Sequence, residues 1–270
     1  MLSLGARPQV AWLALDFSAM GGYLLLFAAG LIAGVLNVVA GGGSFLTLPI
    51  LMFLGLPPGV ANGTNRVGIL LQNVGAVWSF QRHGVLDWRS VLWAAAPSIP
   101  GAALGVWLAL IVSDQAFTRI LALLMVTLSL WTLWSKRQRP SPTSLTETDA
   151  SASGHRFGIG IAFFLIGVYG GFVQAGVGFL ILAATTAAGL DLVRGNAVKV
   201  LTVLCFTALS LALFASSGRV DWMMGLVLAG GTTLGGLAGA RLTVLKGHGW
   251  VRGVVTVTMI LFALKLWFSS

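Results

Sequence analysis

Apolar residues along this chain come in runs of helix length, and short polar stretches separate the runs. The runs lack the alternation of polar and apolar residues that a membrane β-barrel needs. A helix needs about 20 apolar residues to cross the core of a bilayer. The pattern therefore predicts an all-α polytopic membrane protein. We expect four long segments and one short one in each half: 21–39, 44–54, 64–81, 90–112 and 117–135, then 157–173, 179–189, 196–216, 222–242 and 250–268.

Composition excludes a soluble domain. Hydrophobic residues make up 57% of the 270 residues and charged residues 9%, whereas soluble domains carry about 25% charged residues. A chain with so few charges cannot cover itself with a wetted surface, so the lipid bilayer is its expected partner. The net charge of +9 does not indicate a nucleic-acid partner, because the basic residues cluster at the ends of apolar runs, as membrane orientation requires.

The second half of the chain repeats features of the first. Phe45 and Leu46 recur as Phe179 and Leu180. Gly55, Asn62, Gly84, Asp87, Trp88, Gly101 and Gly105 recur in the same order as Gly189, Asn196, Gly218, Asp221, Trp222, Gly235 and Gly239. Duplicated halves that each hold a glycine-broken apolar segment are typical of secondary transporters, whose substrate site lies between the two breaks.

The duplication divides the chain into four parts. Residues 1–20 form an N-terminal lead-in, 21–135 the first membrane repeat, 136–156 a linker and 157–268 the second membrane repeat. The linker is rich in Ser, Thr and Pro and cannot bury apolar area, so we expect it to be flexible.

The direction of the second repeat depends on whether the short segments cross the membrane. If they cross, each half has five passes and the second half is inverted; if they turn back, each half has four passes and the halves are parallel. With the basic linker in the cytoplasm, five passes put more Lys and Arg on the cytoplasmic side than four passes do. We therefore expect two inverted five-segment repeats, each with a short broken helix.

The glycine-rich breaks are the first candidates for a binding site. Gly42, Gly43 and Ser44 precede or open the first short segment, and Gly176, Gly178 and Phe179 precede or open the second. Free N–H groups at the start of a helix attract an anion, and Ser44 could cap the first of these helices. The alternative is a glycine crossing that is tightly packed and binds no ligand.

Polar residues follow each short segment at equivalent places. Asn62, Asn65, Arg66, Asn196, Lys199 and Thr202 fall at the start of helix-length apolar runs. Polar and charged groups within a membrane are costly and usually line a path or a site. The alternative for Arg66 and Lys199 is that their side chains extend to opposite membrane interfaces.

Other repeated residues favour structural roles. Asp87 and Asp221 each stand just before an apolar run, where an aspartate caps a helix. Gly101 and Gly105, like Gly235 and Gly239, form a GxxxG pattern that lets two helices approach closely in lipid. These seams could serve within one chain or between chains, so a homo-oligomer is left open.

Several kinds of chemistry lack the residues they need. No apolar segment has a carboxylate at its centre, which favours an anionic over a cationic substrate. Cys205 is the one cysteine and the three histidines fall in connecting segments, so we expect no metal site and no cofactor. The sequence has no HExxH, no GxSxG and no buried acid pair, which argues against an enzyme.

The motifs resemble those of a known family. AGGG at 40–43 leading to Pro49, then Gly55 and ANGTN at 61–65, resembles the TauE/SafE family of sulfite exporters, also called the 4-toluene sulfonate uptake permease family. The resemblance spans about 21–268, and residues 176–178 and 196–199 fit the same pattern. It implies a duplicated, multi-pass permease of the inner (plasma) membrane for sulfite, sulfonates or related sulfur anions. Val177 and Ala183 stand where the first half has a glycine and Pro49, so the two half-sites are chemically unequal.

Together these features predict a secondary transporter for a small sulfur-containing oxyanion, such as sulfite or an organosulfonate. Transport would proceed by alternating access around the two broken helices. Two alternatives stay open at this stage: a channel-like anion conductor on the same scaffold, and a membrane scaffold that transports nothing.

Overall fold

The computed structural model describes residues 17–82, 84, 86–134 and 152–246. All regular secondary structure in these ranges is α-helix. Nine helices lie in these ranges: α1 (Phe17–Ala40), α2 (Ser44–Phe53), α3 (Pro58–Arg82), α4 (Trp88–Ile111), α5 (Asp114–Trp134), α6 (Ala152–Phe172), α7 (Val177–Ala187), α8 (Leu192–Ser216) and α9 (Trp222–Lys246). The all-α prediction is therefore confirmed for the described residues. The predicted segment 250–268 lies outside them.

Several predicted segment boundaries shift. The helix α1 begins at Phe17, inside the predicted lead-in, and α6 begins at Ala152, inside the predicted linker. An apolar run marks only the part of a helix that lies in hydrocarbon, and the backbone hydrogen bonds continue beyond it into the polar interface. The rest of the lead-in and of the linker lies outside the described residues.

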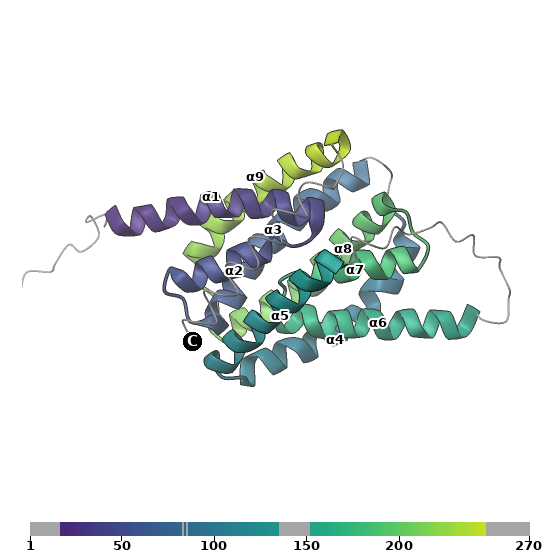
Figure 1. Cartoon of the computed structure of the whole chain (residues 1–270), viewed down its shortest axis with the longest axis horizontal. Helices are drawn as coiled ribbons and strands as arrows, with labels where there is room; N and C mark the ends of the chain where they lie inside the picture. Colours follow the sequence, from purple (N-terminus) through teal and green to yellow (C-terminus); the bar gives the residue numbers. More distant parts are fainter. Residues whose placement is uncertain (1–16, 83, 85, 135–151, 247–270) are drawn as a thin grey trace, which may run out of the picture.

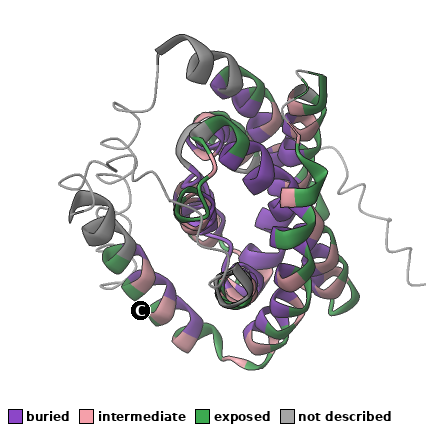
Figure 2. Cartoon of the chain, turned by 90° about the vertical axis from the view of Figure 1, so that its right-hand side faces the viewer, coloured by how far each residue is buried: buried purple, intermediate pink, exposed green. Residues whose placement is uncertain are grey.

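Four helices of the described part are long and apolar enough to cross a bilayer: Met20–Val38, Trp88–Ile111, Val193–Ser216 and Trp222–Gly239. Large apolar side chains such as Leu24, Leu92 and Leu165 are exposed on the outside of the bundle. Figure 2 shows the buried faces of the helices turned inward and the exposed faces turned outward. An apolar exterior of this extent is typical of a surface that faces lipid.

The helices pack in two intimate pairs, α1 with α9 and α4 with α6, while α3 and α8 lie between the pairs and touch each other. Glycine makes both close approaches possible. A Cβ on Gly101 would lie 2.2 Å from the carbonyl oxygen of Phe164, and one on Gly235 would lie 1.9 Å from that of Leu31. The predicted glycine seams are therefore helix contacts, and both are used within the chain.

The two halves enter the bundle from opposite ends. In Figure 1, α1 begins at the left of the view and α6 begins at the right. The short helices α2 and α7 lie on opposite sides of the middle of the molecule (Figure 1). With 10 and 11 residues, each is about 15–16 Å long at 1.5 Å per residue, which is half of a bilayer core.

Candidate functional site

The two glycine breaks lie directly against each other. A Cβ on Gly41 would be 2.7 Å from the Cα of Gly178, and a Cβ on Gly178 would be 2.6 Å from the Cα of Gly41. Gly41 and Gly176 also have positive φ angles, of 82° and 75°, which side chains rarely adopt. The breaks are therefore built for a backbone-to-backbone approach between the two halves.

Each short helix begins at this contact. Gly43 is the N-cap of α2 and Gly176 is the N-cap of α7, and neither cap residue offers a side-chain hydrogen bond. The expected capping role of Ser44 is wrong, because Ser44 is the first helical residue rather than the residue before it. The N–H groups of Phe45 and Phe179 donate to the carbonyl oxygens of Gly42 and Gly176 within the breaks. Both starts still present the partial positive charge of the helix dipole.

The roles of the glycines in the first break differ. Gly43 is needed for packing, since a Cβ there would lie 2.1 Å from the carbonyl oxygen of Ala33 on α1. Gly42 is buried and its carbonyl accepts a hydrogen bond from the Phe45 N–H at 3.2 Å. In the second break, Phe179 is partly buried and packs into the apolar core rather than lining a cavity.

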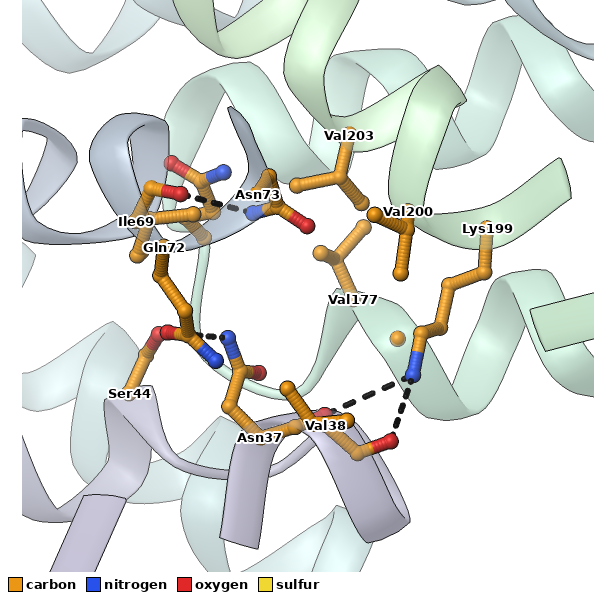
Figure 3. Close-up of a pocket in the computed structure, with 12 residues that line it drawn as sticks. Asn37, Val38, Ser44, Ile69, Gln72, Asn73, Val177, Lys199, Val200 and Val203 are labelled. Atoms are coloured by element: carbon orange, nitrogen blue, oxygen red, sulfur yellow. Dashed lines mark hydrogen bonds between the residues drawn. The ribbon is translucent and has the colours of Figure 1, made fainter. Parts of the chain in front are cut away.

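A small cavity lies beside the meeting point, with a volume of about 10 Å³, roughly the room one ordered water needs. Its lining combines the starts of both short helices with polar side chains of α1, α3 and α8 (Figure 3). The lining residues are Asn37, Val38, Ser44, Ile69, Gln72, Asn73, Gln174, Val177, Gly178, Lys199, Val200 and Val203. Of the predicted site residues, Ser44, Gly178 and Lys199 meet here.

Lys199 is the one basic side chain in the described lining of the cavity. Its side chain is 3% exposed, so it does not extend to a membrane interface. Its Nζ donates to the carbonyl oxygens of Asn37 and Val38, both at 3.4 Å, at the C-terminal end of α1 (Figure 3). No carboxylate belongs to the described lining.

Arg66 is buried completely and contacts the C-terminal end of α6, as Lys199 contacts the C-terminal end of α1. Its guanidinium donates to the carbonyl oxygens of Gly170 at 3.1 Å and Gly171 at 2.5 Å, near the C-terminal end of α6, and to Oε1 of Gln174 at 3.2 Å. It also lies over the ring of Phe214, 4.8 Å from the centroid. Arg66 therefore caps α6, and it reaches the cavity only through Gln174.

Three further predicted residues have structural partners or none. Asn62 donates to the carbonyl oxygen of Phe172 at 2.8 Å. Asn65 accepts a hydrogen bond from the Thr47 hydroxyl at 2.6 Å, which ties α2 to α3. Thr202 is buried with no partner for its hydroxyl and lies outside the cavity lining.

Asn196 is the residue that the sequence comparison of the two halves pairs with Asn62. It is 6% exposed, and its Oδ1 has no hydrogen-bond partner. Asn62 shares this property, since its own Oδ1 is also buried without a partner. Both lie on helices that contribute other residues to the cavity lining, but neither residue lines the cavity itself.

Four polar residues of the lining were not among the predicted site residues. Asn37 donates to Oε1 of Gln72 at 3.2 Å, and Gln72 donates to the carbonyl oxygen of Gly34 at 3.1 Å. Asn73 donates to the carbonyl oxygen of Ile69 at 2.7 Å, and Gln174 donates to the Thr207 hydroxyl. Their signal in the sequence was an amide side chain within an apolar helix or next to a break.

Known proteins are similar in sequence to this chain over nearly its whole length. The family described as sulfite exporter TauE/SafE matches residues 26–266. A probable membrane transporter protein of Haemophilus influenzae is 28% identical over 245 residues, which cover 90% of this chain and 93% of the relative. The probable membrane transporter protein YfcA of Escherichia coli is 29% identical over 252 residues, with 91% and 90% covered.

A more distant relative extends the comparison. The probable membrane transporter protein YunE of Bacillus subtilis is 23% identical over 265 residues, covering 90% of this chain and 97% of the relative. No solved structure matches the chain. The described helices agree with this class, since four of them are long and apolar enough to cross a membrane. The chain therefore belongs to the TauE/SafE sulfite exporter family, a family of multi-pass membrane transporters and not of enzymes.

Proposed function

We propose that the protein is a secondary transporter for a small sulfur-containing oxyanion, sulfite or an organosulfonate. One observation carries the proposal: the starts of α2 and α7 and the amino group of Lys199 line a single cavity, which at about 10 Å³ has to widen before an anion can enter. Helix starts and a lysine all favour negative charge, and the described lining offers no carboxylate that would favour a cation. The name of the family points to the same class of substrate.

The packing supports a mechanism of alternating access between inverted repeats. Exchanging the halves maps the pair α1–α9 onto α6–α4, and it maps α3–α9 onto α8–α4; all four pairs are in contact. The two halves also enter from opposite ends (Figure 1). In transporters with inverted repeats, one repeat moves against the other around a site at the midplane.

Hollows at the two ends of α4 suit such a cycle. One, of about 290 Å³, is lined by Ser113, Asp114 and Arg219 just beyond the end of α4. The other, of about 380 Å³, is lined by Arg89, Ser90 and Trp93 in the first turns of α4. Arg89 would attract an anion toward the bundle, since the described lining of its hollow has no carboxylate, whereas Asp114 offsets the charge of Arg219 in the other hollow.

Ligand-dependent stabilisation tests the choice of substrate. Purified protein is melted with sulfite, thiosulfate, sulfoacetate, methanesulfonate and, as controls, chloride and choline. A bound ligand raises the melting temperature by mass action, so we expect a shift with one or more sulfur anions and none with choline. A shift with choline alone, or with none of the sulfur anions, would contradict the proposal.

Transport in proteoliposomes separates the proposed carrier from the alternatives. A carrier shows saturation and accelerated exchange when unlabelled anion is present on the far side. A channel conducts without saturation or exchange, and a scaffold carries nothing. Flux is measured in both directions. Since the curated relatives are bacterial, we place the protein in the plasma membrane.

A further inference from the structure

Lys199 is the one titratable side chain in the described lining of the central cavity. The other lining residues are apolar, amides, a hydroxyl or glycine. The α1 residues at the cavity are Asn37 and Val38, those from α3 are amides and an isoleucine, and α7 contributes Val177 and Gly178. Among the described lining residues, a proton can therefore bind or leave only on Lys199 Nζ.

Within the described part of the chain, the amino group of Lys199 has no carboxylate partner. Its two acceptors are carbonyl oxygens at 3.4 Å, beyond the usual range of about 2.7–3.2 Å for such bonds. The C-terminal end of α1 supplies a partial negative charge of about half a unit. These two contacts need two N–H groups, and a neutral amine has two.

Arg66 on α3, which is hydrogen-bonded to Oε1 of the lining residue Gln174, is also positively charged. An arginine keeps its proton in proteins, whereas a lysine can lose it in a protein interior. A second positive charge at Lys199 therefore needs an anion beside it, because an unpaired charge within a membrane is expensive.

Resting on the proposed function, we infer that the anion crosses together with one proton, which Lys199 Nζ takes up with the anion and releases with it. On loading, the neutral amine gains a proton from water and the ammonium pairs with the anion. On unloading, the anion leaves and the ammonium returns its proton to water on the same side. The empty transporter then returns with a neutral amine, and a singly charged anion moves without net charge.

The unmodified protein tests this coupling directly. Proteoliposomes take up labelled methanesulfonate, which keeps its single charge across the neutral range, so every coupled proton is carried by the protein. A dye inside reports protons, and valinomycin with potassium sets the membrane potential. We expect an acidic exterior to drive accumulation with one proton per anion, and a potential to have no effect. Uptake driven by the potential without protons, or uptake that requires sodium, would overturn the inference.

A variant that cannot lose its charge sharpens the test. Lys199→Arg keeps a charge that cannot leave, so it is expected to lose at least tenfold of the uptake driven by a pH gradient relative to whatever anion exchange it shows. Arg194→Gln is the matched control, because that side chain lies on the same helix and is 66% exposed; it should keep both activities. Full pH-driven uptake by Lys199→Arg would overturn the inference.

Failure of the inference and failure of the proposed function look different. If the unmodified protein exchanges neither sulfite nor methanesulfonate, the proposed function fails and the inference falls with it. If exchange is present but net uptake ignores the pH gradient, the inference alone is overturned. The proton count in the unmodified protein decides the question even where Lys199→Arg does not fold.

Discussion

Gly41 and Gly178 come from opposite halves of the chain and touch through their backbones, so closely that a Cβ on Gly178 would lie 2.6 Å from the Cα of Gly41. Real side chains do not tolerate such a distance, and the atom in the way is backbone, which cannot rotate aside. The contact therefore fixes how near the two helix starts come to each other, and with it the width of the cavity beside them.

Gly178→Ala should push the two breaks apart. Gly178 lacks a positive φ, so the effect arises from the contact and not from backbone strain. Overpacking of this kind costs about 1–3 kcal/mol, and we expect a lower melting temperature together with loss of anion exchange. Gly160→Ala on α6 is the control, because a Cβ there meets nothing within 4 Å. Unaltered melting and exchange in Gly178→Ala would show that the breaks do not pack as described.

Gly235→Ala tests the seam between α1 and α9. The added Cβ would lie 1.9 Å from the carbonyl oxygen of Leu31, so the helices must separate or shift. We expect the free energy of unfolding to fall by about 1–3 kcal/mol. Gly75→Ala serves as control, since its nearest atom is Thr233 Cγ2 at 4.0 Å. Equal stability of the two variants would contradict the seam.

Glycine positions explain why so much of the fold could be predicted from the sequence. A glycine that repeats in both halves is best explained by a local steric need, and the sequence shows it without knowledge of any partner. Gly101 and Gly235 were placed in helix seams in this way, and both lie against a carbonyl oxygen of a neighbouring helix. The helix segments followed from apolar length alone, which is also a local property.

Side-chain partners could not be predicted in the same way. Arg66 and Asn62 were expected at a substrate site, yet they cap α6 in the other half, a contact more than a hundred residues away in sequence. Gln174, which lines the cavity, stands before Ala175-Gly176, whereas Val39 stands before the matching Ala40-Gly41, so the duplication gave it no signal. Which carbonyl a buried donor finds is decided by the packing of helices from both halves.

The start of α8 should depend on pH through Asp191. Its Oδ1 accepts hydrogen bonds from the backbone N–H groups of Arg194, at 3.0 Å, and Val193, at 2.9 Å. The backbone hydrogen bond from Arg194, followed by that from Val193, holds the pKa of the Asp191 carboxyl below its usual value. A lowered pKa in the folded state means stability that is present above the unfolded pKa, about 3.9, and is lost as pH falls through the folded pKa.

Melting curves of Asp191→Ala measure this contribution. The variant should melt below the unmodified protein at neutral pH, because α8 loses its N-cap. The difference should shrink as the pH falls through the folded pKa of Asp191. Asp191→Asn should melt between the two, since asparagine still caps but carries no charge. A difference that stays constant with pH would contradict the role of the ionised carboxylate.

We expect Arg66 to contribute mainly to the stability of the fold and Lys199 mainly to anion binding. Arg66→Gln leaves the carbonyls of Gly170 and Gly171 without their donor in a buried place, and each unsatisfied group costs about 1–3 kcal/mol. We therefore expect a large fall in melting temperature. Lys199→Gln removes only two long contacts to α1, so its melting temperature should change less.

The response to an anion should show the reverse order. Lys199 lines the cavity directly, whereas Arg66 reaches it only through Gln174. Methanesulfonate or sulfite should therefore raise the melting temperature of Arg66→Gln by nearly as much as that of the unmodified protein. Lys199→Gln should lose most of the shift, because the cavity no longer has a positive charge to set against the anion. Equal shifts in both variants would remove Lys199 from the binding site, and loss of the shift in Arg66→Gln alone would assign the anion to Arg66.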